Sequence, residues 1–351
     1  MVVLIVKRNA LLDFLRVIAA LGVLLAHWTW SPEWVQVNFQ RSPTEVFGVL
    51  TQLARYGYLG VPIFFMISGA VVIRSAINKT PSEFLKARAM RILPLYYLAI
   101  LISAGFKSID GVEPIKSVIK DSVYSALLII PISGANWLNP VFWTLSLEVQ
   151  FYLLVMFSVL LLQFIGTKER YIPLVLSILC LILQLFSIPL FSGLELTAYL
   201  PFFLVGILAS TSQSGKEKIF AILGILTFIL LGTRSLIERT DMLGRTASTI
   251  LLLMSCAATL LICSYWIPRM RMFQSRNLYI LGLMTYPIYL FHVEPARVLL
   301  GFMLNSGLHV TASFVSVFLT LVWLSWFLTK HFEPLIVGAL NRNLFPRRFK
   351  Y

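Results

Sequence analysis

Charged residues are scarce in this chain. Asp, Glu, Lys and Arg make up 13% of its 351 residues, while 58% are hydrophobic, and the mean hydropathy is +0.85. A water-soluble domain could not solvate such a composition. The shortage of charge therefore excludes a soluble domain and predicts an all-α polytopic membrane protein.

Cysteine is also rare, and its placement excludes two classes of site. The three residues, Cys180, Cys256 and Cys263, fall inside apolar runs without a CxxC spacing and without a histidine nearby in sequence. They are typical of packing residues rather than of disulfides or metal ligands. We expect no metal.

Acidic residues are outnumbered, with 15 Asp and Glu against 29 Lys and Arg and a formal net charge of +14. The basic residues lie between apolar runs instead of forming one basic face with interleaved aromatics, so nucleic acid is a poor explanation for them. The two halves show no repeat, so an inverted-repeat transporter has no positive support.

The apolar runs predict about ten spans, each close to the ~20 residues that cross the hydrocarbon core. The N-terminal run lacks a convincing small-residue cleavage site, so we interpret it as the first retained span and not as a signal peptide. We expect a single domain over 1–351, with a helical bundle over about 9–330 and a basic cytoplasmic tail over 331–351. The expected helices cover about 9–30, 57–73, 92–106, 141–165, 172–190, 197–212, 219–233, 246–265, 278–304 and 310–330.

The loop charges predict the orientation. Loops on one side hold 19 of the Lys and Arg residues and loops on the other hold 9, with Arg16 left inside the first span. Because short cytoplasmic loops carry the positive excess, both termini should be cytoplasmic. His27, at the far end of the first span, then lies toward the outer face.

The first span, LLDFLRVIAALGVLLAHW, is unusual in carrying Asp13, Arg16 and His27. Arg16 and His27 are eleven residues apart, about three helical turns, so they share one stripe roughly 16 Å apart along the axis. Asp13 precedes Arg16 by three residues, a spacing that allows an ion pair. Ionisable groups at membrane depth need a partner or a function. Alternatively, Asp13 and Arg16 only flank the membrane and His27 belongs to the interfacial belt.

A short basic segment precedes the third span. Thr80 or Ser82 can cap a helix start there, and we expect an amphipathic stretch that lies in the membrane interface, with Phe84 facing inward. Arg88 and Arg91 remain available to anions.

Five blocks, in order, carry a resemblance: LLDFLRVIAALGVLLAHW, GVPIFFMISGAVV, FLKARAMRILPLYYL, FWTLSLEVQFYLL and TYPIYLFHVEP. The chain resembles the acyltransferase-3 family of membrane acyltransferases over nearly its whole length. The most specific match is the motif in which Arg16 is followed, after ten intervening residues, by His27. The Phe64-Phe65-x-x-Ser68-Gly69 turn, the Arg88 and Arg91 pair and the run from Trp143 to Glu148 match further blocks.

The resemblance implies a ten-helix unit in the inner (cytoplasmic) membrane. Such a unit moves an acyl group, usually acetyl from acetyl-CoA, to a hydroxyl of an envelope glycan or lipid-linked saccharide. Two departures stand out. The arginine block reads KARAMR rather than a denser cluster, and no SGNH hydrolase-like domain follows, which implies that the unit completes the transfer unaided or with a separate protein.

Acyl transfer to a sugar hydroxyl needs a base, and neutral imidazole is the usual choice. His27 could instead carry the acyl group covalently, and the sequence leaves both routes open. Glu148, in an otherwise apolar span, is the best carboxylate to orient His27 or bind the acceptor, with Asp13 as a further catalytic candidate. Glu148 could also be a simple helix-end carboxylate at the interface.

The donor carries several phosphates, which guanidinium groups bind bidentately. We expect Arg88 and Arg91 to hold them and Arg16 to meet the pyrophosphate or pantetheine. Ordinary positive-inside anchoring explains the arginine pair equally well. Ser68 could border a site for the donor, although small residues more often permit close helix packing. His292 matches a family position but more often would be structural.

Two rival functions stay open. A transporter or flippase of a lipid-linked saccharide or acidic solute would line its pathway with Asp13, Arg16, His27 and Glu148. An acyltransferase of a small secondary metabolite would share the chemistry and differ in the acceptor. The sequence does not indicate the oligomeric state.

Overall fold

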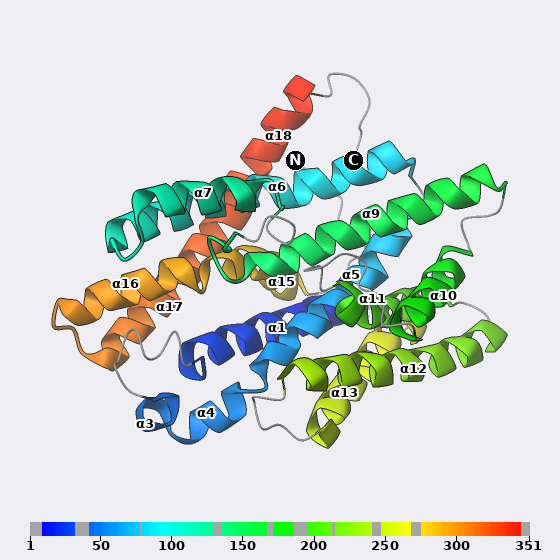
Figure 1. Ribbon diagram of the computed structural model, residues 1–351, viewed down its shortest axis with the longest axis horizontal. Coiled ribbons are helices and arrows are strands. Elements are labelled where there is room, and N and C mark those ends of the chain that lie inside the picture. Colours follow the sequence, from blue (N-terminus) through cyan, green and yellow to red (C-terminus); the bar gives the residue numbers. More distant parts are fainter. Residues whose placement is uncertain are drawn as a thin grey trace. The chain divides into compact units, whose positions relative to one another are not determined.

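Helices are the regular secondary structure of the described part of this computed structural model, joined by turns and short irregular segments (Figure 1). The structure describes residues 9–31, 42–77, 79–129, 135–166, 171–185, 196–212, 215–240, 247–267 and 275–344. No strand occurs within these ranges.

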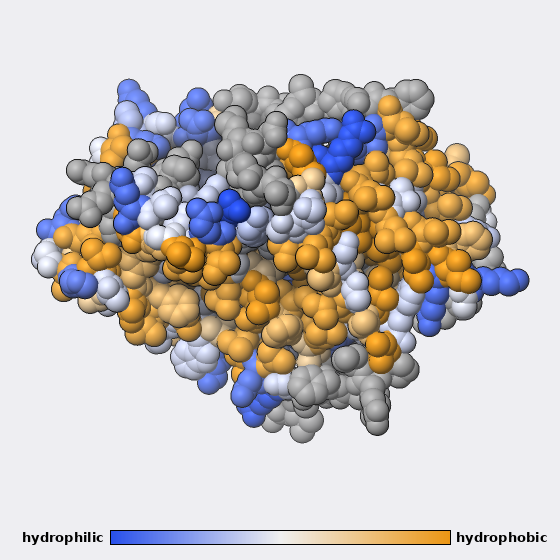
Figure 2. All heavy atoms as spheres, turned by 90° about the horizontal axis from the view of Figure 1, so that it is seen from below, coloured by the Kyte–Doolittle hydropathy of each residue, from blue (hydrophilic) through white to orange (hydrophobic). Residues whose placement is uncertain are grey.

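Seven helical stretches among the described residues are long and apolar enough to cross a membrane, and two shorter apolar helices accompany them. Many large apolar side chains lie exposed, including Phe164 at 91% and Leu101 at 70%. Hydrophobic residues cover much of the face shown in Figure 2. Lipid can cover such a surface where water cannot. The all-α, multi-pass membrane class is therefore confirmed, while the number of crossings and the side of each terminus stay predictions.

The chain forms two compact units. The first takes Met1–Val23, Arg55–Leu85 and Thr144–Gly282, and the second takes Leu24–Ala54, Lys86–Trp143 and Leu283–Tyr351. Four helices contribute residues to both units: α1 (Ala10–Thr29), α6 (Pro81–Asp110), α9 (Phe142–Phe164) and α15 (Arg276–Phe291).

The first unit is built around α11. This helix is apolar on all sides and almost wholly buried, as expected for a helix enclosed by others. It contacts α5, α10, α12 and α13. The elements confined to this unit are η1 (Gly57–Leu59), α5 (Gly60–Ala76), α10 (Ile172–Leu185), α11 (Leu196–Thr211), α12 (Gly215–Thr240) and α13 (Ala247–Trp266).

Hydrogen bonds from buried side chains connect the helices of the second unit. The Tyr96 hydroxyl donates to the Ser125 carbonyl at 2.6 Å, and the Asn139 amide donates to the Leu290 carbonyl at 3.1 Å. The elements confined to this unit are α3 (Pro43–Phe47), α4 (Val49–Ala54), α7 (Ile115–Ala126), α16 (Glu294–Asn305), α17 (Val310–Phe327), the π-helical turn η4 (Leu328–Phe332) and α18 (Glu333–Leu344).

The basic segment continues directly into the third expected span, and its position in the membrane interface stays a prediction. Residues 81–110 form one helix, α6, with Pro94 inside it. A proline removes one backbone hydrogen bond, which membrane helices tolerate because neighbouring groups compensate. The expected start is confirmed, since the Thr80 hydroxyl accepts from the Glu83 amide and the Glu83 carboxylate accepts from the Thr80 amide. Phe84 faces inward as expected, with 1% exposed.

The expected helix over 278–304 is interrupted. It consists of α15 and α16, separated by the turn His292–Val293. Pro295, in the first turn of α16, has no N–H to bond to the Phe291 carbonyl, which favours a helix start at this point. The break places His292 outside both helices.

Candidate functional site

The predicted site residues divide between the two units. Asp13, Arg16, Ser68 and Glu148 belong to the first, and His27, Arg88 and Arg91 belong to the second. Within the first unit the described contacts join Asp13 to Arg16 and Ser68 to Glu148. No hydrogen bond or ion pair between described residues joins His27 to either arginine in the second.

Asp13 and Arg16 form the expected ion pair, with a guanidinium nitrogen 2.9 Å from the carboxylate. Asp13 is 1% exposed. A Cβ added at Gly282 would lie 2.6 Å from an Asp13 oxygen, so the backbone of α15 packs directly against this carboxylate. The pair keeps both charges compensated in an apolar bundle, as buried charges require.

Glu148 lies in the second turn of α9 and is half-buried. The Ser68 hydroxyl donates to its carboxylate at 2.9 Å, and the Tyr152 hydroxyl donates to the same oxygen. Two charge-assisted hydrogen bonds fix the orientation of this carboxylate. Sequence reasoning missed Tyr152, although its position four residues after Glu148 on one helix was a usable signal.

A close helix crossing holds Ser68 in place. A Cβ added at Gly69 would strike the Phe203 carbonyl, and one added at Gly206 would strike the Met66 carbonyl. Only glycine at both positions lets the backbones of α5 and α11 touch. The close crossing expected for the Ser68-Gly69 pair is confirmed.

Aromatic rings complete the same packing. Phe203 stacks on Phe65 at 4.6 Å and on Phe151 at 4.0 Å between ring centroids. Because Phe151 belongs to α9, its contact with Phe203 ties the helix of Glu148 to the crossing. The position of the carboxylate thus follows from a compact apolar core.

His27, near the end of α1, faces a second histidine. Its ring centroid lies 5.2 Å from that of His292, with the rings meeting edge to face. His27 is half-buried, whereas His292 is 1% exposed. The neighbouring Trp28 donates from its indole N–H to the His292 carbonyl at 2.6 Å. The pair therefore joins the end of α1 to the turn between α15 and α16.

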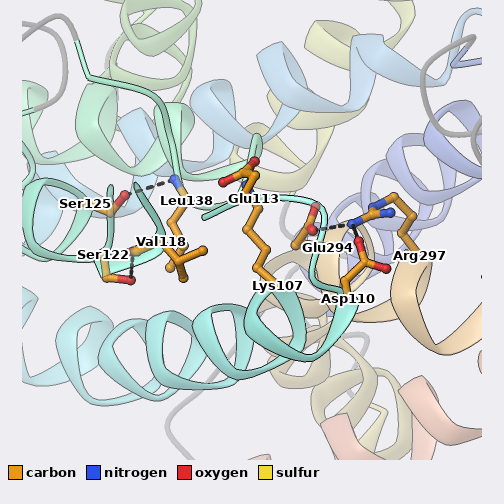
Figure 3. A network of polar contacts seen from close by, with 9 residues as sticks. All are labelled: Lys107, Asp110, Glu113, Val118, Ser122, Ser125, Leu138, Glu294 and Arg297. Carbon is orange, nitrogen blue, oxygen red and sulfur yellow. Dashed lines mark hydrogen bonds and ion pairs between the residues drawn. The ribbon is translucent and has the colours of Figure 1, made fainter. Parts of the chain in front are cut away.

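An ion-pair network fixes the helix that follows this turn (Figure 3). Arg297 of α16 contacts Asp110 at 2.9 Å and Glu294 at 2.7 Å. Asp110 is the last residue of α6, so the network fastens the start of α16 to the end of α6. Lys107, which lies one turn before Asp110 on α6, forms an ion pair with Glu113 in the segment after the helix. These contacts hold the His292–Val293 turn in position from its C-terminal side.

Arg88 and Arg91 lie on consecutive turns of α6, as expected. Arg88 is half-buried and Arg91 is exposed. Guanidinium groups three residues apart on one helix present neighbouring forks to the same side. Their role toward a phosphate stays a prediction.

A cavity of about 1140 Å³ lies in the first unit, between α5, α10, α11 and α12, and Arg74 and Glu217 are its charged lining residues. None of the predicted site residues lines it. Within the described ranges, no group of three His, Cys, Asp or Glu residues is placed to hold a metal ion.

Comparison with known proteins identifies the family of this chain. The acyltransferase domain family matches residues 9–330. The chain is 38% identical over 106 residues to the exopolysaccharide production protein ExoZ of Rhizobium meliloti, covering 27% of this chain and 32% of that protein. It is 27% identical over 160 residues to nodulation protein 10 of Rhizobium leguminosarum bv. viciae, covering 40% and 41%.

A third relative, protein 2 in the picA locus of Rhizobium radiobacter, is 33% identical over 106 residues, covering 28% of this chain and 46% of that protein. The aligned segments thus span less than half the length of each of these relatives. No solved structure matches the chain significantly.

Proposed function

The chain belongs to the acyltransferase domain family, as its motifs indicated, and we propose from this premise that it is a membrane O-acyltransferase. It moves an acetyl group from acetyl-CoA, supplied from the cytoplasm, to a hydroxyl of a cell-surface glycan. The observation that carries the proposal is the His27 imidazole, half-buried beside a second imidazole in a chain of this family. The names of the relatives, which include exopolysaccharide production, support a polysaccharide acceptor.

In the proposed reaction, His27 takes the proton from the acceptor hydroxyl as its oxygen attacks the thioester carbonyl. The carbon–sulfur bond of the resulting tetrahedral intermediate then breaks, and the imidazolium returns the proton to the leaving CoA thiolate. A positioned general base contributes about 10²–10⁴ in rate. In the alternative covalent route, the His27 nitrogen itself attacks the thioester and passes the acetyl group on.

The predicted site residues suggest how the substrates bind. Arg88 and Arg91 bind the phosphates of the donor at the inner face, and Arg16, kept in place by Asp13, meets the pantetheine end. Ser68 and Glu148 provide a fixed hydroxyl and carboxylate, groups that bind sugar hydroxyls or the amide groups of pantetheine. We place the enzyme in the inner membrane as a single functional domain.

The direct test is transfer of radiolabelled acetyl from acetyl-CoA by the purified full chain in detergent, with envelope polysaccharide from a deletion strain as the acceptor. We expect release of CoA and, in membranes from the source bacterium, labelled envelope polysaccharide that a deletion strain lacks. A protein that binds but never cleaves acetyl-CoA would contradict the proposal and favour a transport role for the same residues.

Delivery across the membrane has its own test. Ser82 and Ser306 are exposed, and the loop charges place them on opposite sides. Single cysteines at these positions, in a background without the natural cysteines, should react differently in sealed, oriented vesicles. An impermeant thiol reagent applied outside should label position 306 and miss position 82. Labelling of both from one side would refute cross-membrane delivery and leave acyl transfer itself standing.

A further inference from the structure

His292 has one nitrogen in use and one without a partner. Nδ1 lies 2.8 Å from the Tyr289 carbonyl oxygen. Nε2 is buried, and no described residue forms a hydrogen bond with it. A buried polar atom without a partner is costly, so each such atom in a native structure calls for an explanation.

The carbonyl contact fixes the tautomer of this imidazole. A carbonyl oxygen only accepts, so Nδ1 must be the nitrogen that carries the proton. In the neutral ring, Nε2 is then an acceptor with a lone pair. A flip of the ring would break its hydrogen bond to Tyr289. The backbone of His292 is held as well, because its N–H donates to the Ile288 carbonyl and its own carbonyl accepts from the Trp28 indole.

Among the described residues, the ring of His27 is a neighbour that can satisfy this lone pair. The two ring centroids are 5.2 Å apart. Ring nitrogens lie about 1.1 Å from their centroid, so nitrogens that faced each other would be about 3 Å apart, a hydrogen-bond distance. The rings now meet edge to face, so a hydrogen bond between them requires the His27 ring to rotate about its soft Cβ–ring torsion.

We propose that His292 is a positioning residue for the His27 base, acting as a neutral hydrogen-bond acceptor that fixes which His27 nitrogen carries the proton. This inference rests on the proposed function. With one His27 nitrogen donating to Nε2 of His292, the other exposes its lone pair to the acceptor hydroxyl.

The proton balance is simple in this arrangement. His27 gains the hydroxyl proton while the new carbon–oxygen bond forms, and it returns that proton when the carbon–sulfur bond breaks and the thiolate leaves. His292 keeps its Nδ1 proton throughout and supports the transient imidazolium through its lone pair. Neutral His292 thus takes the part that a carboxylate plays in a serine hydrolase, without placing a further charge at membrane depth.

Two substitutions separate this role from a structural one. His292→Asn places an amide N–H where Nδ1 was, so it can keep the bond to the Tyr289 carbonyl but loses the acceptor at Nε2. His292→Gln places an amide oxygen where Nε2 was, so it keeps the acceptor and loses the Tyr289 bond. Each variant therefore keeps one hydrogen-bonding function of the ring and loses the other.

The assay is CoA release from acetyl-CoA by the full chain in detergent, with envelope polysaccharide from a deletion strain as the acceptor. We expect kcat to fall about 10- to 100-fold in His292→Asn, the cost of an unsatisfied buried donor on His27, with the acetyl-CoA KM unchanged. His292→Gln should stay within about threefold of the wild type. The opposite order, equal losses, or two fully active variants would each overturn the inference. Thermal melting of both variants, compared with the wild type, controls for folding.

A second readout does not depend on activity. Nitrogen-15 spectra of histidine-labelled protein, with His309→Gln and His331→Gln to simplify them, should show His292 protonated at Nδ1. Protonation at Nε2 would overturn the inference even in an active enzyme. A wild type that does not cleave acetyl-CoA, with His292 protonated at Nδ1, would instead refute the proposed function and leave the geometry of the pair intact.

Discussion

The two groups of site residues satisfy their polar atoms in opposite ways. In the first unit, Glu148 accepts from Ser68 and Tyr152, and Asp13 pairs with Arg16. In the second, the contact that the described residues show for His27 is with the ring of His292, and within the same part of the chain Nε2 of His292 has no hydrogen-bond partner. Groups fixed by hydrogen bonds and ion pairs are suited to positioning, whereas the half-buried imidazole of His27 is suited to proton transfer.

This comparison predicts that losing an imidazole costs more activity than losing a fixed carboxylate. His27→Ala should lower acetyl transfer by about 10²–10⁴, because the base or acyl carrier itself is removed. The rate of CoA release, measured with membrane level and melting temperature, checks this. His331→Ala, at an exposed histidine, is the matched control and should leave the rate unchanged. Wild-type rates in well-folded His27→Ala would break the comparison.

A smaller effect is expected at Glu148. Glu148→Gln keeps an oxygen for Ser68 and Tyr152 but removes the charge, and we expect kcat/KM to fall about tenfold, the loss of a charge-assisted contact. Kinetics with both substrates varied would show which one Glu148 positions. Tyr152→Phe, which keeps its packing against Phe84 and the charge of Glu148, should cost less. A greater loss at Tyr152 than at Glu148 would reverse the assignment.

The smallest effect should arise at the arginine pair. Arg88→Lys and Arg91→Lys keep the charge and lose the fork, so the acetyl-CoA KM should rise a few-fold, about threefold to tenfold, with kcat unchanged. Initial rates over a range of acetyl-CoA concentrations measure this. Lys86→Arg, at an exposed position of the same helix, is the control. An unchanged KM in both variants would mean that the pair only anchors the helix at the membrane surface.

Local features of the fold could be predicted from the sequence. The Asp13 and Arg16 pair follows from a three-residue spacing, and the start of α6 follows from the Thr80 and Glu83 capping box. The long apolar helices α1 and α9 lie within one residue of their expected bounds at each end. Each of these features depends on residues close together in the chain.

Long-range features could not be predicted in this way. The contact of Ser68 with Glu148 joins residues 80 positions apart, and the contact of Trp28 with His292 joins residues 264 apart. Proline was an ambiguous signal as well. Pro94 lies inside the unbroken α6 and Pro295 follows a break, because tertiary contacts such as that between Arg297 and Asp110 decide where a helix ends.

The glycine crossing of α5 and α11 also limits how the protein can respond to its substrates. Backbones that touch at Gly69 and Gly206 cannot slide past each other or roll without losing contact along the whole interface. Ser68 is therefore held at a fixed place before any substrate arrives. An incoming substrate meets a group whose ordering entropy was already lost during folding, so little of its binding energy is needed to organise this part of the protein.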